Sequence, residues 1–178
     1  MIEMGNYISY NILKLEVREI DSEYITVKMG KQKHIALIAH DSKKREMVDW
    51  VYENRDILKN HFLCGTGTTA RLLAMKTGLP VREYKSGPLG GDQQIGSRIV
   101  EGAIDFMVFF WDPLEAQPHD PDVKALLRVS VLYDIPVANN IATANFLLTS
   151  KYMSEEYTRK ITQYQRTSEE MLNKFLED

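Results

Sequence analysis

A chain of 178 residues, of which 44% are hydrophobic and 26% charged, has the size and composition of one folded domain rather than of a disordered protein. The net charge of −3 argues against a nucleic-acid binder, and no apolar run is long enough to span a bilayer. Its one cysteine, Cys64, excludes an intramolecular disulfide and, without neighbouring ligands, a structural zinc site. We therefore expect a cytoplasmic protein with no nucleic-acid partner and no membrane partner.

Short apolar strands alternate with amphipathic helices along the middle of the chain. Residues 35–39 form a continuous apolar run flanked by charge, as in a strand covered on both faces. Residues 43–60 place apolar side chains at helical spacing, with charge between them. The alternation continues with predicted strands at 62–64, 80–84, 104–111 and 135–138, and with predicted helices at 68–77, 93–101, 122–133 and 142–148.

Five strands that alternate with helices predict an α/β fold with three layers, in which a parallel sheet lies between two layers of helices. Before it, residues 11–29 alternate around the turn-like Asp21-Ser22-Glu23 and predict a β-hairpin, with a flexible tail as the alternative. The sequence after Ser154 is polar, and residues 167–176 have a helical pattern. We divide the chain into an N-terminal extension (1–30), an α/β domain (31–153) and a C-terminal helical segment packed on that domain (154–178).

The polar and glycine-rich loops of the chain follow its predicted strands. They cover residues 39–41, 65–69, 86–92 and 111–122, and each leads into a predicted helix. In an open parallel sheet, ligands bind beyond the carboxyl ends of the strands. One shared site is therefore the simplest explanation for these four loops.

The loop GTGTT (65–69) has the residue types of an anion site. Glycines let backbone N–H groups approach an anion, threonines add hydroxyl donors, and the following helix offers its positive end. The loop lacks the GxxxxGK[ST] pattern of nucleoside-triphosphate sites. Turn geometry and helix capping alone would also explain it. Lys44 and Ser86-Gly87 could contact the same anion if the loops converge.

Two acidic loops suggest proton transfer. Asp92 follows Gly90-Gly91, where the small residues let a carboxylate approach a ligand closely, although an N-cap is the ordinary role of such an Asp. His119 lies beside Asp120 and Asp122, which can orient an imidazole for acid–base work. The alternative there is a rigid turn in which Asp122 caps the next helix.

Other readings of these polar residues remain open. His40 and Asp41 could form a structural hydrogen bond, and Asp112 could cap the loop before Pro113. A divalent metal held by His40, Asp41, Asp92 and His119 is a rival on residue types, but no HxH or HExxH spacing supports it. We expect no metal and no cofactor.

At these loops the sequence resembles the methylglyoxal synthase family, whose members convert dihydroxyacetone phosphate to methylglyoxal and inorganic phosphate. The resemblance covers residues 34–148, and its most specific segments are GPLGGDQQ and WDPLEAQPHDPDVKALLR. Also matched are HIALIAHDSKK, GTGTTARLL and IPVANNIATANFLL. The first thirty residues are longer than the family's usual lead-in, and the C-terminal region matches at Tyr164-Gln165-Arg166 alone. A looser likeness to the regulatory domain of carbamoyl phosphate synthetase would imply the fold without the acidic motifs.

The resemblance implies a sheet with strand order 3-2-1-4-5, a homohexamer, inhibition by phosphate, and a terminal arginine, with Arg166 as the candidate, that reaches an active site. It also implies roles for the loop residues, with Asp92 as the base. The expected catalytic residues are Asp92, His119, Asp122 and Asp41. The expected substrate and phosphate contacts are His40, Lys44, Thr66, Gly67, Thr68, Thr69, Ser86, Gly87 and Asp112.

Three other functions remain as alternatives. A non-catalytic regulatory domain that binds a small phosphorylated effector is compatible with the fold, but the combination of Asp92, His119 and Asp122 favours a lyase. A metal-dependent hydrolase or lyase would lose activity with a chelator. A structural assembly module would leave the four loops without a common purpose.

Overall fold

The computed structural model describes residues 17–20, 24–115, 119–162 and 173–176. Contacts along the chain divide it into two compact units. One unit is Met29–Tyr157, and the other combines the described residues on either side of it.

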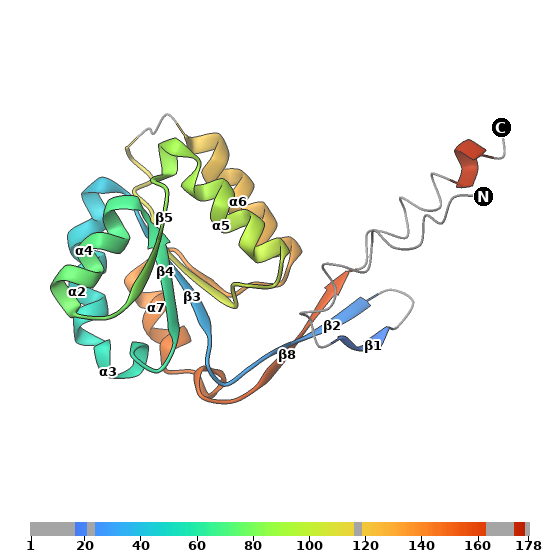
Figure 1. The fold of residues 1–178 in the computed structure, drawn as a ribbon, viewed down its shortest axis with the longest axis horizontal. Coiled ribbons are helices and arrows are strands. Elements are labelled where there is room, and N and C mark those ends of the chain that lie inside the picture. Colours follow the sequence, from blue (N-terminus) through green and yellow to red (C-terminus); the bar gives the residue numbers. More distant parts are fainter. Residues whose placement is uncertain (1–16, 21–23, 116–118, 163–172, 177–178) are drawn as a thin grey trace. The chain divides into compact units, whose positions relative to one another are not determined.

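The larger unit is built on five parallel strands. These are β3 (His34–Ala39), β4 (Phe62–Thr66), β5 (Val81–Tyr84), β6 (Phe106–Phe110) and β7 (Val137–Ala138). Their order across the sheet is β5-β4-β3-β6-β7, with every neighbouring pair parallel. This is the expected order 3-2-1-4-5, so the predicted fold is confirmed (Figure 1).

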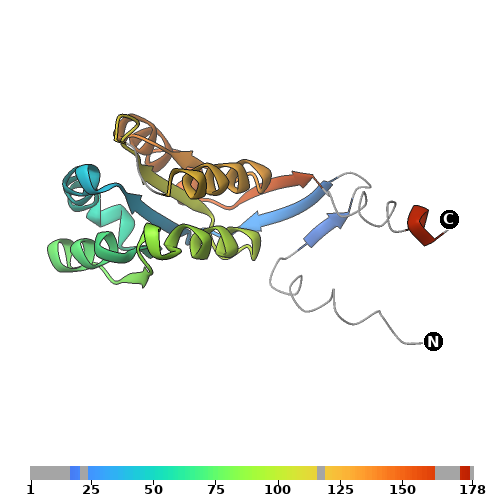
Figure 2. The same ribbon diagram turned by 90° about the horizontal axis from the view of Figure 1, so that it is seen from above.

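Helices cover both faces of this sheet (Figures 1 and 2). Because side chains alternate along a strand, Ile35 and Leu37 of β3 face one helical layer, whereas Ala36 and Ile38 face the other. The first layer contains α2 (Lys44–Glu53), α3 (Arg55–Leu58), α4 (Gly67–Thr77) and α7 (Ile141–Leu148). The second layer contains α5 (Gly91–Val100) and α6 (Asp120–Leu132).

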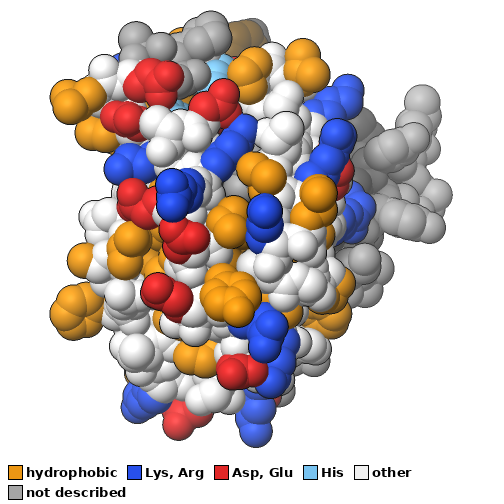
Figure 3. Space-filling view, turned by 90° about the vertical axis from the view of Figure 1, so that its left-hand side faces the viewer, with side chains coloured by type: hydrophobic (Ala, Val, Ile, Leu, Met, Phe, Trp, Pro, Cys, Tyr) orange, Lys and Arg blue, Asp and Glu red, His pale blue; other side chains and the backbone are white. Residues whose placement is uncertain are grey.

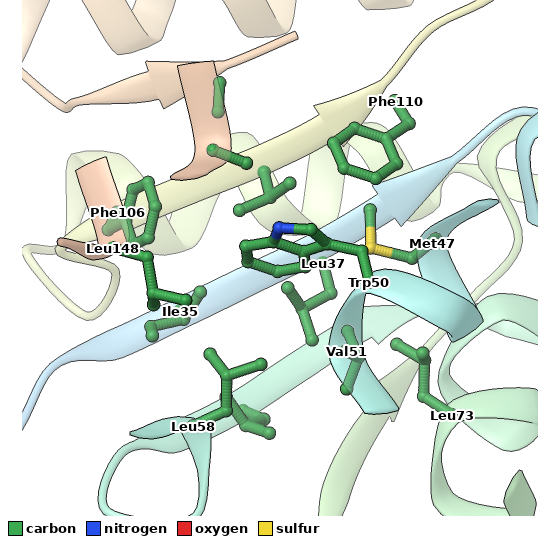
Figure 4. Packing of buried hydrophobic residues seen from close by; sticks show 14 of the residues in the cluster. Ile35, Leu37, Met47, Trp50, Val51, Leu58, Leu73, Phe106, Phe110 and Leu148 are labelled. Carbon is green, nitrogen blue, oxygen red and sulfur yellow. The ribbon is translucent and has the colours of Figure 1, made fainter. Parts of the chain in front are cut away.

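Trp50 is the largest side chain in the hydrophobic cluster between the sheet and the first helical layer (Figure 4). Its ring meets that of Phe110 edge to face, with centroids 6.0 Å apart. Its Nε1 donates a hydrogen bond to Asn145 Oδ1 at 2.8 Å, so the polar atom of the buried indole has a partner. Met47 and Leu37 are fully buried in the same cluster. Each such side chain contributes about 1.5–3 kcal/mol.

The helix predicted over residues 43–60 is two helices, because the chain turns at Asn54. The side chain of Asn54 donates from Nδ2 to the Trp50 carbonyl at 2.8 Å, a local hydrogen bond that competes with helix continuation. The short helices η1 (Asp41–Lys43) and η2 (Gly87–Leu89) were not predicted either. Gly78 and Gly102 each follow a helix in the left-handed conformation, with φ values of 72° and 70°.

Figure 3 shows the outer face of the layer that contains α2 and α4, where basic and acidic side chains are interspersed with isolated hydrophobic ones. This is the solvent-facing side of amphipathic helices. Among the described residues, no helix combines the length and the apolar character needed to cross a membrane.

The smaller unit contains the predicted hairpin. β1 (Val17–Ile20) pairs antiparallel with β2 (Tyr24–Met29), with Val17 opposite Val27, so the hairpin is confirmed for the described residues. Residues 11–16 and the turn at 21–23 lie outside them. A further strand, β8 (Tyr157–Thr162), extends this sheet on the other side of β2, where we had expected helix. Of the helix predicted at 167–176, the described residues 173–176 are helical.

Lys33 joins the two ends of the α/β unit. Its side chain is 1% exposed, and its Nζ donates hydrogen bonds to the backbone carbonyls of Gly30 and Glu155. Burial lowers the pKa of this ammonium group, while the nearby carboxylate of Asp105 opposes the shift. A buried ammonium that left these carbonyls would lose its hydrogen bonds without regaining water, so the pairing holds the ends together.

The buried thiol of Cys64 provides a test of the packing. Burial raises its pKa to about 12, and the thiolate is the reactive form. We expect a thiol reagent such as DTNB to leave the native protein unmodified at pH 8 and to react with one thiol per chain in urea. Rapid labelling of the native protein would show that β4 is not enclosed as described.

Candidate active site

The loops that follow β3, β4 and β5 enclose a cavity at the carboxyl edge of the sheet, together with the start of α6. Its volume is about 480 Å³ including the open mouth. Most of the residues predicted from the loops line this one cavity, so the predicted convergence is present. Those residues are His40, Asp41, Lys44, Thr66, Thr68, Thr69, Ser86, Gly87, Asp92 and His119.

Asp92 is buried in the wall of this cavity, with 3% of its surface exposed. It lies in the first turn of α5, but the N-cap position is held by Gly90 and has no side-chain cap, so Asp92 is not the N-cap. Among the described residues its Oδ2 has no hydrogen-bond partner. Burial raises the pKa of Asp92, His119 opposes the shift, and the carboxylate of Asp122 adds to it. A higher pKa makes the carboxylate a stronger base.

Close backbone packing holds Asp92 in this position. The carbonyl of Ser86 accepts hydrogen bonds from the N–H groups of Leu89 and Gly91, at 3.0 and 2.9 Å. A Cβ atom at Gly91 would lie 2.0 Å from the carbonyl oxygen of Lys85, so any other residue would push the loop away from α5. The glycines before Asp92 therefore let the turn fold tightly.

His119 faces Asp92 from the first position before α6. Its Nε2 lies 3.7 Å from Asp92 Oδ2, which is beyond a hydrogen bond but leaves little space between the two groups. The ring of His119 also meets that of His40, with centroids 5.9 Å apart. Asp122 does not line the cavity; it lies in the first turn of α6 and acts on Asp92 through its charge.

The tautomer of His40 follows from its surroundings. Burial lowers the pKa of His40, and His119 lowers it further, so the ring is neutral at pH 7. Its Nδ1 faces the backbone N–H of Asp112 at 3.4 Å and accepts that hydrogen bond. The ring proton is therefore on Nε2. Within the described part of the chain Nε2 is buried without a partner, which leaves it available as a donor to a ligand.

The opposite wall is suited to an anion. Thr66 is the N-cap of α4 and its side chain makes no capping hydrogen bond, so the first amide groups of the helix are open to a ligand. Lys44 Nζ donates to Thr68 Oγ1 and to Asp41 Oδ1 beside them. The hydrogen bond from Lys44 lowers the pKa of Asp41, which keeps the Asp41 carboxylate ionised at the rim of the cavity.

Two other predicted contacts lie outside the cavity. Gly67 has φ 37°, and a Cβ there would lie 2.8 Å from Ser86 Cβ, so it lets the loops after β4 and β5 touch. Asp112 accepts hydrogen bonds from Ser42 Oγ at 2.8 Å and Leu114 N at 3.0 Å, which is the loop-capping alternative. Arg166 lies outside the described residues.

Sequence reasoning missed some of the lining residues. Phe109 packs edge-on against His40, with centroids 5.4 Å apart, and Pro88 lies beside Gly87. Phe109 is one apolar residue in a buried strand, so nothing in its sequence context marks it as part of a site. In the described residues there is no group of three or more His, Cys, Asp or Glu side chains that could hold a metal ion.

The site therefore combines an anion cradle, formed by Lys44, Thr68 and the first amides of α4, with the buried carboxylate of Asp92 and the neutral imidazole donor of His40. Such an arrangement can hold a phosphate ester while a carboxylate removes a proton from a nearby carbon.

The family model described as MGS-like domain matches residues 46–139. A methylglyoxal synthase of Clostridium acetobutylicum is 61% identical over 136 residues, which are 76% of this chain and 94% of the relative. One from Pectobacterium atrosepticum is 53% identical over 150 residues, which cover 84% and 99%. A crystal structure of methylglyoxal synthase from Elizabethkingia anophelis superposes with a TM-score of 0.75 at 47% identity, covering 78% of this chain and 91% of that one. The chain belongs to the methylglyoxal synthase family.

Proposed function

We propose that this cavity converts dihydroxyacetone phosphate to methylglyoxal and inorganic phosphate, with Asp92 as the base. The observation that carries the assignment is the buried Oδ2 of Asp92, which has no partner in the described part of the chain and lies in the same cavity as the Lys44 ammonium and the start of α4. A three-carbon phosphate ester bound between these walls presents its carbonyl and hydroxymethyl carbons to Asp92 and the two histidines.

In the first step, Asp92 removes a proton from the hydroxymethyl carbon. The electron pair of the C–H bond forms a carbon–carbon double bond, and the carbonyl oxygen takes the negative charge of an enediolate. The His40 Nε2–H group can donate to this oxygen, and a neutral donor avoids transferring its proton too early. His119, 3.7 Å from Asp92 Oδ2, can move a proton between the enediol oxygens and the carboxyl group.

In the second step, the bond between carbon and the phosphate oxygen breaks. After the proton of the remaining hydroxyl group has moved to the former carbonyl oxygen by way of His119, the hydroxyl oxygen forms a new carbonyl. The electrons of the enediolate double bond then shift to form a double bond to the phosphate-bearing carbon. Phosphate leaves with the electron pair of the broken bond, and the resulting enol tautomerises to methylglyoxal. Elimination requires the breaking bond to stand perpendicular to the enediolate plane. Lys44 and the first amides of α4 hold the phosphate in that orientation and stabilise the charge as it leaves.

Several wider assignments belong to this proposal. The lining residues all fall between Ile38 and His119, which supports residues 31–153 as the catalytic domain, with additions at 1–30 and 154–178. We also propose a homohexamer, supported by large exposed apolar side chains such as Val131 and Phe146. Product phosphate would compete for the anion cradle and inhibit. A cytoplasmic location is supported by the sole cysteine of the chain.

A non-catalytic domain that binds a phosphorylated effector is the second candidate. The anion cradle suits it equally well. The position of Asp92 favours catalysis, because a buried carboxylate in an anion site weakens simple binding and is useful where a base is needed.

We expect Asp92→Asn to lower kcat at least about 100-fold, because the amide cannot accept the proton. The assay measures phosphate release from dihydroxyacetone phosphate and traps the dicarbonyl product, with and without a chelator. The control is Asp56→Asn, an exposed carboxylate on α3 that should leave turnover unchanged. Normal turnover by the Asp92 variant would show that Asp92 is not the base. A wild-type protein that releases no phosphate would refute the proposed function.

The same substitution should stabilise the fold at neutral pH. The pKa of Asp92 is raised in the folded state, so folding favours the protonated carboxyl, and this contribution is lost as pH rises through the folded pKa. Asn cannot ionise. The difference in free energy of unfolding between variant and wild type, measured by urea denaturation, should be positive at pH 7 and shrink as the pH is lowered toward 4. A difference that does not change with pH would contradict the burial argument.

Gly87→Ala tests the contact between the catalytic groups. The added Cβ would lie 2.8 Å from His119 Nε2 and 3.0 Å from Asp92 Oδ2, so it intrudes between them. We expect kcat to fall about 10-fold or more, while the melting temperature changes little because the methyl group points into the cavity. Loss of folding, or unchanged kcat, would each show that Gly87 does not separate the two groups as described.

A further inference from the structure

The side chains that line the catalytic cavity do not provide a net positive charge for a substrate that is a phosphate dianion. Among the described lining residues, Lys44 is the one lysine or arginine, whereas Asp41 and Asp92 carry carboxyl groups. The whole chain has a net charge of −3. When both carboxylates are ionised, these three side chains sum to −1, so the cradle can bind a phosphate that has arrived, but neither the cavity nor the molecule as a whole attracts a dianion from a distance.

A basic groove begins at the mouth of this cavity. The two share Thr68 and Ser86 as lining residues, and the groove continues between α4 and α5 beside the end of β5. Four basic side chains and one carboxylate line it, and the carboxylate of Glu101 pairs with one of the four, which leaves a local excess of two positive charges. The five residues are Arg71, Arg82, Lys85, Arg98 and Glu83.

Two of these four cations form ion pairs with carboxylates, and the other two do not. Arg71 makes a two-pronged contact with Glu83, and Arg98 donates to Glu101 at 2.7 Å. The Arg82 guanidinium lies over the ring of Tyr84, 5.3 Å from its centroid, a contact that brings no opposite charge. Within the described part of the chain, Arg82 and Lys85 form no ion pair, and both are exposed.

We propose that this groove, from Thr68 to Arg98, is an electrostatic collecting surface that draws the dianionic substrate to the catalytic cavity. The inference rests on the proposed function. Clustered charges at the entrance of a cleft raise the local concentration of an oppositely charged substrate and its rate of association, by tenfold or more. The groove supplies the attraction that the carboxylate-containing cavity lacks.

A second fixed phosphate site in the groove is less well supported. Fixed sites hold an anion with oriented donors, whereas Arg82, Lys85 and Arg71 are exposed and the Arg71 donors are occupied by Glu83. Solvated cations of this kind act through their field, and that field weakens as salt increases.

The test compares a groove variant with a matched control. The groove variant is Arg82→Gln with Lys85→Gln. The control is Arg55→Gln with Lys59→Gln, which removes the same two charges near α3, just before β4 and so at the other end of the strands. Steady-state kinetics with dihydroxyacetone phosphate are measured between about 0.01 and 1 M ionic strength, over which the Debye length falls from about 30 to about 3 Å.

We expect the groove variant to keep the wild-type kcat and to lose about three- to tenfold in kcat/KM at low ionic strength, with the loss disappearing at high salt. The control should follow the wild type closely. Binding of inorganic phosphate, measured by calorimetry over the same range, should weaken in parallel and gives a reading that does not need turnover.

Equal salt dependence of the groove and control variants would overturn the proposal. A loss that persists at high salt would also overturn it, because that result would mean direct contact with the ligand. Failure of the wild type to form methylglyoxal would refute the proposed function, and the phosphate titrations would still decide whether the groove attracts anions to the cavity.

Discussion

Parallel pairing of β3 with β4 on one side and β6 on the other is the constraint on which the rest of the molecule depends. The register places Leu37 opposite both Gly65 and Val108, so these strands advance together toward the same edge. The polar loops must then begin close to one another. A Cβ at Gly65 would lie 2.6 Å from the Leu37 carbonyl oxygen, and this close approach of β3 and β4 brings the anion cradle beside His40.

The site departs from ordinary burial rules where the proposed chemistry needs it. Buried polar atoms are nearly always hydrogen-bonded, yet among the described residues Asp92 Oδ2, His40 Nε2 and His119 Nδ1 have no partner. Two of the three belong to Asp92 and His119, whose side chains approach each other in the lining of the cavity. Tight backbone packing around Ser86 and Gly91 holds Asp92 in its position and offsets part of this local cost.

Much of this could be predicted because apolar runs and turn residues are local signals. The five strands, their helices and the hairpin at β1 and β2 followed from such patterns. The break at Asn54 did not, since it depends on one side-chain hydrogen bond to Trp50. Strand β8 is polar and pairs with a strand more than a hundred residues earlier, so it has no local signature. This distance in sequence, rather than any unusual composition, conceals it.

Within the site, residue type and position after a strand located Asp92, His119 and the threonine loop. Whether a side chain enters the cavity depends on backbone and side-chain rotations that move its atoms by a few ångströms, and the periodicity of the sequence does not encode them. Asp112 and Asp122 illustrate this, since one holds a loop and the other acts on Asp92 at a distance. Phe109 lines the cavity although it lies in a strand for which the sequence predicts only a buried, structural position. The family resemblance contributed the strand order and the substrate, which the residue patterns did not.

The pairing of the Gly30 and Glu155 carbonyls with one buried ammonium has an architectural consequence. The α/β unit starts and finishes at the same place, beside the amino ends of its strands, while catalysis is assigned to the carboxyl ends. The first and last residues of this unit therefore lie at the end remote from the catalytic cavity. Because its two ends lie close together, such a fold can accept added segments, or be circularly permuted so that the chain begins in another loop, without rebuilding its catalytic groups.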